Sequence, residues 1–186
     1  MTVAVPAAGL GGTARREYDA RVRKPPAGGP SPAGSPTATT NPPGARVISL
    51  NLNIEFEARV ASHLADDQVV WLTTVDAAGT PQPTPVWFLW DGQSVLVYSK
   101  PGQAKLRNVA ANPRVSLSFN SDVHGNDVVV LLGSAAVDPG APPADASPAY
   151  VAKYGPGIAS IDLTPASFSA EYAVAVRVVP DRLRGF

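Results

Sequence analysis

Polar and basic side chains gather where an apolar run ends and a helical pattern begins, over residues 98–107. Hydroxyl and cationic groups beside the N–H groups of a helix start suit a phosphate or a carboxylate. The same residue types are also typical of a solvent-exposed helix face, so the residues alone leave both interpretations open. The side chains in question are Tyr98, Ser99, Lys100, Gln103, Lys105 and Arg107.

Three predicted β-strands lead into this segment, over residues 69–75, 83–90 and 94–99. The second and third are joined by Asp-Gly, which between two apolar runs is a strong hairpin signal. Prolines alternate at the start of the second strand, and proline cannot donate a hydrogen bond to a neighbouring strand. We therefore expect residues 82–86 to form an edge, a bulge or a strand end. Such a segment either borders a ligand site or protects a sheet edge against aggregation.

The remaining pattern adds short helices and three more strands. Phe56, Val60 and Leu64 recur at four-residue spacing, which predicts a helix that begins near Asn53. Six short strands with tight turns and few helices indicate a mainly β fold, a small closed or split β-barrel. The other predicted helices cover residues 103–111, 148–154 (stopped by the Gly-Pro-Gly at 155–157) and a turn from 164, and the other strands cover 114–119, 127–137 and 171–179.

The length of 186 residues is enough for one domain with one core. Residues 1–50 are rich in proline, glycine and alanine, which predicts a disordered N-terminal extension. This extension is either an interaction tail or a dispensable leader. The folded domain is expected to cover residues 51–186.

The composition argues against several classes of function. The chain has no cysteine, which excludes disulfides and thiolate catalysis, and with two histidines we predict no metal site. Residues 51–186 carry nine basic and thirteen acidic side chains, so the folded part is a poor match for nucleic acid. The sequence shows no dinucleotide fingerprint, phosphate-binding Walker loop or nucleophile elbow. No apolar run is long enough to cross a membrane and no secretory signal is evident, so we expect a cytoplasmic protein.

Two motifs give the sequence a family resemblance. Residues 79–88 read G-x-P-x-x-x-P-V-W-F, and residues 99–108 read S-K-P-x-x-x-K-x-x-N. Together they resemble the pyridoxamine 5′-phosphate oxidase-like split-barrel superfamily, and more narrowly its actinobacterial flavin/deazaflavin oxidoreductase branch, which uses coenzyme F420. The similarity covers about residues 54 to 184.

The resemblance implies a six-stranded split barrel that forms a homodimer, with the cofactor in a groove between the subunits. It places the cofactor phosphate at the end of the third strand and the following helix, and the ring along the second strand. The other subunit approaches the ring with the start of its fifth strand. The matching positions are Ser99, Lys100, Ala104 and Lys105 for the phosphate, Gln82, Pro83, Thr84, Pro85 and Val86 for the ring, and Asn126, Asp127 and Val128 for the second subunit.

The function implied by the resemblance is hydride transfer between F420 and an unknown small organic substrate, with no side chain that stands out as a catalytic acid or base. An enzyme that uses flavin mononucleotide (FMN) on the same fold is one alternative. A non-catalytic protein that stores F420 or binds heme is another, because a fold does not fix a function. The Arg-rich phosphate motif of true pyridoxamine phosphate oxidases is not evident, which argues against vitamin B6 oxidation and weakens the case for FMN.

Overall fold

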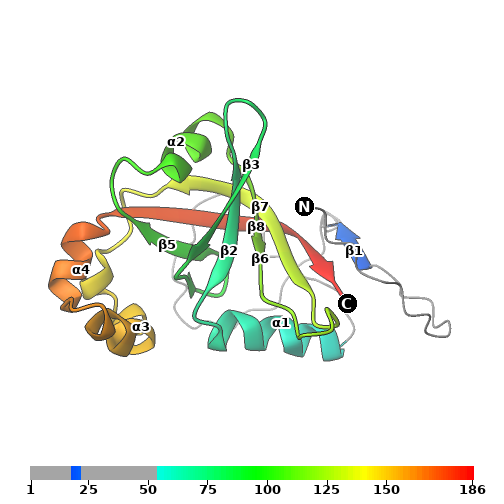
Figure 1. The fold of residues 1–186 in the computed structure, drawn as a ribbon. Coiled ribbons are helices and arrows are strands. Elements are labelled where there is room, and N and C mark those ends of the chain that lie inside the picture. Colours follow the sequence, from blue (N-terminus) through cyan, green and yellow to red (C-terminus); the bar gives the residue numbers. More distant parts are fainter. Residues whose placement is uncertain (1–17, 22–53) are drawn as a thin grey trace, which may run out of the picture.

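A computed structural model describes residues 18–21 and 54–186 of the chain. Its centre is an antiparallel sheet curved into a half-barrel, in which the strands follow the order β3-β2-β6-β7-β8-β5-β4 (Figure 1). A further short strand, β1, pairs with the end of β8. The strands are β1 (Tyr18–Arg21), β2 (Val70–Val75), β3 (Pro81–Val86), β4 (Leu89–Trp90), β5 (Val95–Ser99), β6 (Arg114–Ser118), β7 (Val129–Val137) and β8 (Val174–Gly185).

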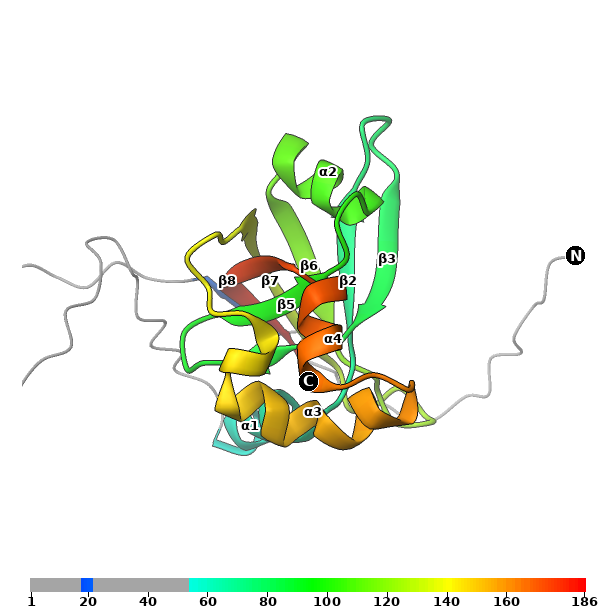
Figure 2. The same cartoon turned by 90° about the vertical axis from the view of Figure 1, so that its left-hand side faces the viewer.

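In the described part of the chain, four α-helices surround the sheet, and two of them lie together beside β5 (Figures 1 and 2). The predicted apolar face of the first helix is confirmed, because Phe56, Val60 and Leu64 are all buried in the core of the half-barrel. The helices are α1 (Ile54–Asp66), α2 (Ala104–Ala111), α3 (Pro148–Ser160) and α4 (Pro165–Glu171), and a short 3-10 helix covers Ala144–Ala146.

Strand β5 is buried on both of its faces. Val95 and Val97 point into the core of the half-barrel, whereas Leu96 and Tyr98 pack into a second apolar cluster formed with α3 and α4. A strand held from both sides fixes the position of its end, Ser99, and therefore of the segment that follows it. This segment leads into the candidate site.

The structure corrects the strand count. Each of the six predicted strands is found, but the second one breaks at Trp87–Phe88 into β3 and β4, and β1 is additional. The break has a cause in the tertiary structure: the backbone N–H of Phe88 donates to the Tyr154 hydroxyl, which also lies 2.7 Å from the Phe88 carbonyl oxygen. These backbone groups are therefore paired with a helix instead of with a neighbouring strand.

Two elements also have bounds that differ from the predicted ones. Helix α3 does not stop at Gly155-Pro156-Gly157 but continues to Ser160. Tyr150, Tyr154 and Ile158 follow each other at four-residue spacing and are all buried, so packing outweighs the hydrogen bond that a proline removes from a helix. The last strand begins at Val174 and not at Glu171, because Glu171 is the last residue of α4. It ends at Gly185 and not at residue 179, because it continues to pair with β7 as far as Gly185.

The predicted disorder of residues 1–50 lies outside the described residues, except that Tyr18–Arg21 form β1. Within the described part of the chain, no helix combines the length and the apolar character needed to span a membrane. The same residues contain no cluster of three or more His, Cys, Asp or Glu side chains that could hold a metal ion.

Candidate functional site

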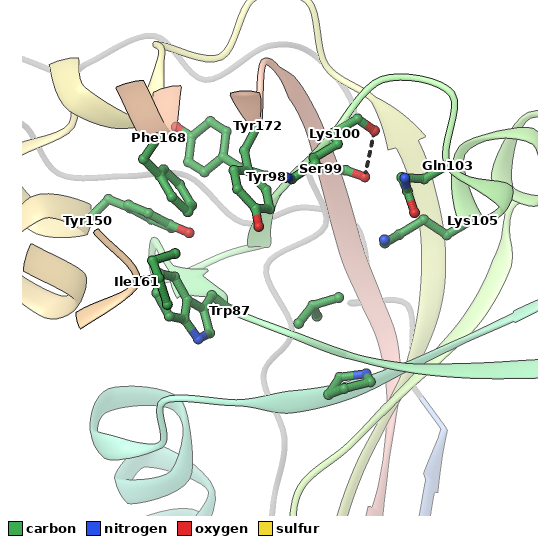
Figure 3. A pocket seen from close by; sticks show the side chains of 12 residues that line it. Trp87, Tyr98, Ser99, Lys100, Gln103, Lys105, Tyr150, Ile161, Phe168 and Tyr172 are labelled. Carbon is green, nitrogen blue, oxygen red and sulfur yellow. Dashed lines mark hydrogen bonds between the residues drawn. The ribbon is translucent and has the colours of Figure 1, made fainter. Parts of the chain in front are cut away.

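A pocket of about 420 Å³ opens between the sheet and helices α2, α3 and α4 (Figure 3). Small-molecule sites usually measure roughly 300–1,000 Å³, so the pocket has the size of a ligand site. Basic and amide groups occupy one end and aromatic rings the other, as Figure 3 shows. The lining residues are Pro85, Val86, Trp87, Tyr98, Ser99, Lys100, Gln103, Lys105, Tyr150, Ile161, Phe168 and Tyr172.

The basic end of the pocket (Ser99, Lys100, Gln103 and Lys105) is built where β5 leads into α2. Gly102 makes the turn with φ of +76°, a conformation that glycine adopts without strain. Gln103 precedes α2 without a side-chain cap, and the first turn of the helix holds no acidic residue. The first N–H groups of a helix lack partners within the helix and favour negative charge, so this end of the pocket suits an anion.

The two lysines at the basic end differ in their partners. Lys100 Nζ donates to Glu171 Oε2 over 2.6 Å, and this hydrogen bond raises the pKa of Lys100. Lys105 is half-buried and has no hydrogen-bond or ion-pair partner among the described residues. Burial lowers the pKa of Lys105, as expected for a cation that no carboxylate compensates. Lys105 is therefore the cation best placed to pair with an anionic ligand.

Aromatic rings and one aliphatic side chain, Ile161, form the aromatic end of the pocket. The rings are those of Trp87, Tyr150 and Phe168, with Tyr98 and Tyr172 at the border. Trp87 is nearly parallel to Phe168, at 5.6 Å between ring centroids, and also stacks on Tyr154 at 4.8 Å. Phe168 in turn stacks on Tyr172 at 4.3 Å. Parallel rings of this kind favour a flat apolar ligand.

The tyrosine hydroxyls around the aromatic end have different surroundings. The Tyr98 hydroxyl donates to the Pro142 carbonyl oxygen over 2.7 Å, and Tyr154 bonds to the backbone of Phe88. The Tyr150 hydroxyl is buried and has no partner within the described part of the chain. Burial raises the pKa of all three side chains, to about 12 for Tyr154, so these hydroxyls remain protonated at neutral pH.

A family model described as pyridoxamine 5′-phosphate oxidase matches residues 56–184. The chain belongs to this family. A search of curated protein sequences found no match. The membership agrees with the half-barrel sheet, because this is the split-barrel fold that the sequence motifs led us to expect.

Several solved structures share the fold. A putative pyridoxamine 5′-phosphate oxidase from Listeria innocua is 23% identical, with a TM-score of 0.52 over 69% of this chain and 95% of that one. A conserved hypothetical protein from Mycobacterium tuberculosis is 20% identical, with a TM-score of 0.55 over 77% and 88% of the two chains. An FAD-binding protein from Mesorhizobium loti is 17% identical, with a TM-score of 0.51 over 69% and 90%.

The structure brings together part of the set of residues that the family resemblance implied. Pro85, Val86, Ser99, Lys100 and Lys105 all line the pocket, and the last three belong to its basic end. The remaining implied residues do not line the pocket of a single chain; they are Gln82, Pro83, Thr84, Ala104, Asn126, Asp127 and Val128.

These outlying positions have contacts of their own. The Gln82 amide donates to Asp76 within the β2–β3 hairpin, and Ala104 is exposed on α2. Asp127 lies against α1, where its Oδ2 is 3.1 Å from Nε2 of His63. Arg107, which the sequence grouped with the basic segment, instead donates to the Gly102 carbonyl oxygen over 2.7 Å.

The sequence reading missed the contribution of the C-terminal helices. Tyr150, Ile161, Phe168 and Tyr172 belong to or follow α3 and α4, far along the chain from the basic segment. The four-residue spacing of Tyr150 and Tyr154 is typical of a shared helix face, but the spacing does not indicate which part of the sheet that face covers. This placement depends on how the helices pack over β5.

Proposed function

We propose that the protein is an oxidoreductase that binds the deazaflavin F420 and transfers a hydride between it and a small organic substrate. The observation that carries the proposal is the basic end of the pocket, where an uncompensated lysine at the start of α2 shares the pocket with Pro85 and Val86 of β3. This arrangement fits a cofactor that joins an anionic group to a flat ring system lying along β3, and it leaves the aromatic end of the pocket for a second molecule. Family membership supports a flavin-type cofactor, and the two sequence motifs favour F420 within it.

The residues present fit such a cofactor. Lys105, Ser99 and the N–H groups at the start of α2 would hold the phosphate, and Pro85 and Val86 would lie along the ring. Lys100 would assist less, because Glu171 already neutralises its charge. The cofactor, when bound, supplies the hydride chemistry, and the protein supplies binding, orientation and exclusion of water.

We further propose that the active form is a homodimer. Residues 126–128 lie at the α1 end of the half-barrel in one chain, whereas the basic end of the pocket lies beside α2. A second copy of the chain could bring these residues to the pocket, which is the arrangement that the family resemblance implies.

The test is a titration of cofactor-free protein, produced in a host that lacks F420, with F420 and separately with FMN. We expect tighter binding of F420. We expect Lys105→Ala to weaken that binding by roughly 10- to 100-fold, because a charge-assisted hydrogen bond contributes about 1.5–3 kcal/mol. Arg114→Ala is the matched control: it removes one positive charge from β6, where Arg114 pairs with Asp181 outside the pocket.

The outcomes separate the candidate functions. Tighter binding of FMN than of F420 would identify a flavin nucleotide as the cofactor of this site. Equal losses of F420 affinity in the Lys105→Ala and Arg114→Ala variants would show that Lys105 does not contact the cofactor. Tight binding of F420 whose reduced form no electron acceptor reoxidises would favour storage of the cofactor over catalysis.

A further inference from the structure

The Tyr150 hydroxyl is a polar group for which the described part of the chain offers no partner. The side chain of Tyr150 is fully buried, and its oxygen makes no hydrogen bond to any described residue. An unpaired buried hydroxyl costs folding free energy, so such groups are rare in native proteins. A protein that keeps one at the wall of a pocket has a ready donor for a ligand.

The surroundings of this hydroxyl define which ligand it suits. Figure 3 shows the Tyr150 ring reaching from α3 toward the pocket, between Phe168 and Trp87 and on the side away from Lys105. The centroid of the Tyr150 ring lies 4.8 Å from that of Tyr98 and 6.0 Å from that of Phe168. Among the residues that line the pocket, the charged side chain nearest the aromatic end is Lys100, whose Nζ lies 5.0 Å from the Tyr172 ring centroid and is already paired with Glu171. An ionic group at the aromatic end would therefore lose its hydration without gaining a free counter-ion.

We propose that the aromatic end of the pocket binds the substrate, that the substrate carries a flat, uncharged ring with a carbonyl group, and that the Tyr150 hydroxyl donates a hydrogen bond to that carbonyl oxygen. Tyr150 is then a residue that determines substrate specificity. The inference rests on the proposed function only in calling this ligand the substrate, because the cofactor ring is assigned to the neighbouring segment of β3. The raised pKa of Tyr150 agrees with a donor that stays protonated.

The matched variant is Tyr150→Phe, which removes the hydroxyl and keeps the ring. Because that hydroxyl has no partner among residues 18–21 and 54–186, we expect the variant to unfold at the same temperature as the wild type or a few degrees higher. Tyr154→Phe is the control, since it removes a hydroxyl that is bonded to Phe88 and should lower the unfolding temperature. A Tyr150 variant that unfolds as early as the Tyr154 variant would overturn the proposal.

The binding experiment uses two flat probes, 9-fluorenone and fluorene, which differ in one carbonyl group, and cofactor-free full-length protein. We expect the wild type to bind fluorenone more tightly than fluorene. Tyr150→Phe should weaken fluorenone binding by about 3- to 10-fold, the effect of one neutral hydrogen bond, and leave fluorene binding unchanged. The infrared carbonyl stretch of bound fluorenone should lie at lower frequency in the wild type than in the variant.

Three results would overturn the inference: no binding of fluorenone, equal binding of both probes by the wild type, or an equal loss for both in the variant. A fourth would be displacement of fluorenone by saturating F420 or FMN, because the aromatic end would then hold the cofactor ring. The cofactor-free measurements do not depend on cofactor binding. Binding of fluorenone through Tyr150 can therefore be confirmed even if the protein does not bind F420, and it can be refuted even if F420 binding is confirmed.

Discussion

Tyr154 connects a helix to the break between β3 and β4, and removing its hydroxyl tests how that break is held. The oxygen lies 2.8 Å from the Phe88 backbone nitrogen, 2.7 Å from the Phe88 carbonyl oxygen and 2.9 Å from the Gln68 carbonyl oxygen. It accepts from the Phe88 N–H, and its own proton is directed at one of the two carbonyl groups. Tyr154→Phe keeps the ring that stacks on Trp87 and removes these bonds.

The expected cost follows from the burial of Phe88, which is fully inaccessible to solvent. Each lost hydrogen bond costs about 0.5–1.5 kcal/mol, and a buried backbone group left unpaired costs about 1–3 kcal/mol. Since no solvent reaches Phe88 to replace the hydroxyl, we expect a loss of roughly 2–4 kcal/mol in the free energy of unfolding. This corresponds to a fall of roughly 10 °C in the unfolding temperature.

Urea titration with two control variants provides the measurement. Tyr98→Phe removes one hydrogen bond, to the Pro142 carbonyl oxygen, and should cost about 1 kcal/mol. Tyr150→Phe removes a hydroxyl without a described partner and should cost nothing. The reasoning is refuted if Tyr154→Phe lies within 0.5 kcal/mol of the wild type, a margin close to the error of such titrations, or if the order of the three variants differs.

Three further variants probe the site and its support. Glu171→Gln should tighten binding of the anionic cofactor by up to about 5-fold, because Lys100 loses its counter-ion. Calorimetry measures the affinity, and an unchanged value would show that Lys100 does not face the anion. Gly133→Ala should destabilise the protein by roughly 3 kcal/mol, since its Cβ would lie 2.3 Å from the Val179 carbonyl oxygen; unchanged urea stability would contradict this. Asp138→Asn should cost about 1–2 kcal/mol at pH 7, because Asp138 accepts from Arg177. That hydrogen bond lowers the pKa of Asp138 below 3.8, so its stabilisation is complete above this pH and is lost as pH falls through the lowered pKa. The difference in unfolding free energy between wild type and Asp138→Asn should therefore begin to narrow below about pH 4 and disappear as pH falls through the lowered pKa.

Local patterns in the sequence predicted the elements that depend on near neighbours. The spacing of Phe56, Val60 and Leu64 specified α1, and Thr164 with Pro165 specified the start of α4, where Thr164 and Ser167 form a capping box. The sequence also grouped the residues of the basic end, which follow one another between β5 and α2, while leaving open whether they bind an anion or face solvent. In each case the physical cause lies within a few residues of its effect.

The features that the sequence did not predict have causes that are distant along the chain. The break at Phe88 depends on Tyr154, which is 66 residues away, and α3 passes through Pro156 because Ile158 is buried against the second cluster. The aromatic end of the pocket follows from the packing of α3 and α4 over β5. Periodicity shows that a helix has an apolar face, but it does not show which surface that face will cover.

The proposed homodimer makes a prediction about residues 126–128, which would reach the pocket of the partner subunit. If one protomer supplies Lys105 and its partner supplies Asp127, then Lys105→Ala and Asp127→Asn each damage every site of their own homodimer. In a mixed dimer the two defects fall in the same site, and the other site is intact. Random mixing should therefore restore about a quarter of the wild-type sites.

The experiment is to unfold and refold the two variants together and to titrate the mixture with whichever cofactor the wild type binds. We expect recovery of about a quarter of the high-affinity sites, and none when each variant is refolded alone. Lys105→Ala refolded with Arg114→Ala is the reference for recovery on refolding, since Arg114 lies outside the pocket and half of the sites should be intact whether or not the protomers exchange. Light scattering establishes that the samples are dimers. No recovery in a dimeric mixture, or full affinity in a monomeric wild type, would place the whole site within one chain.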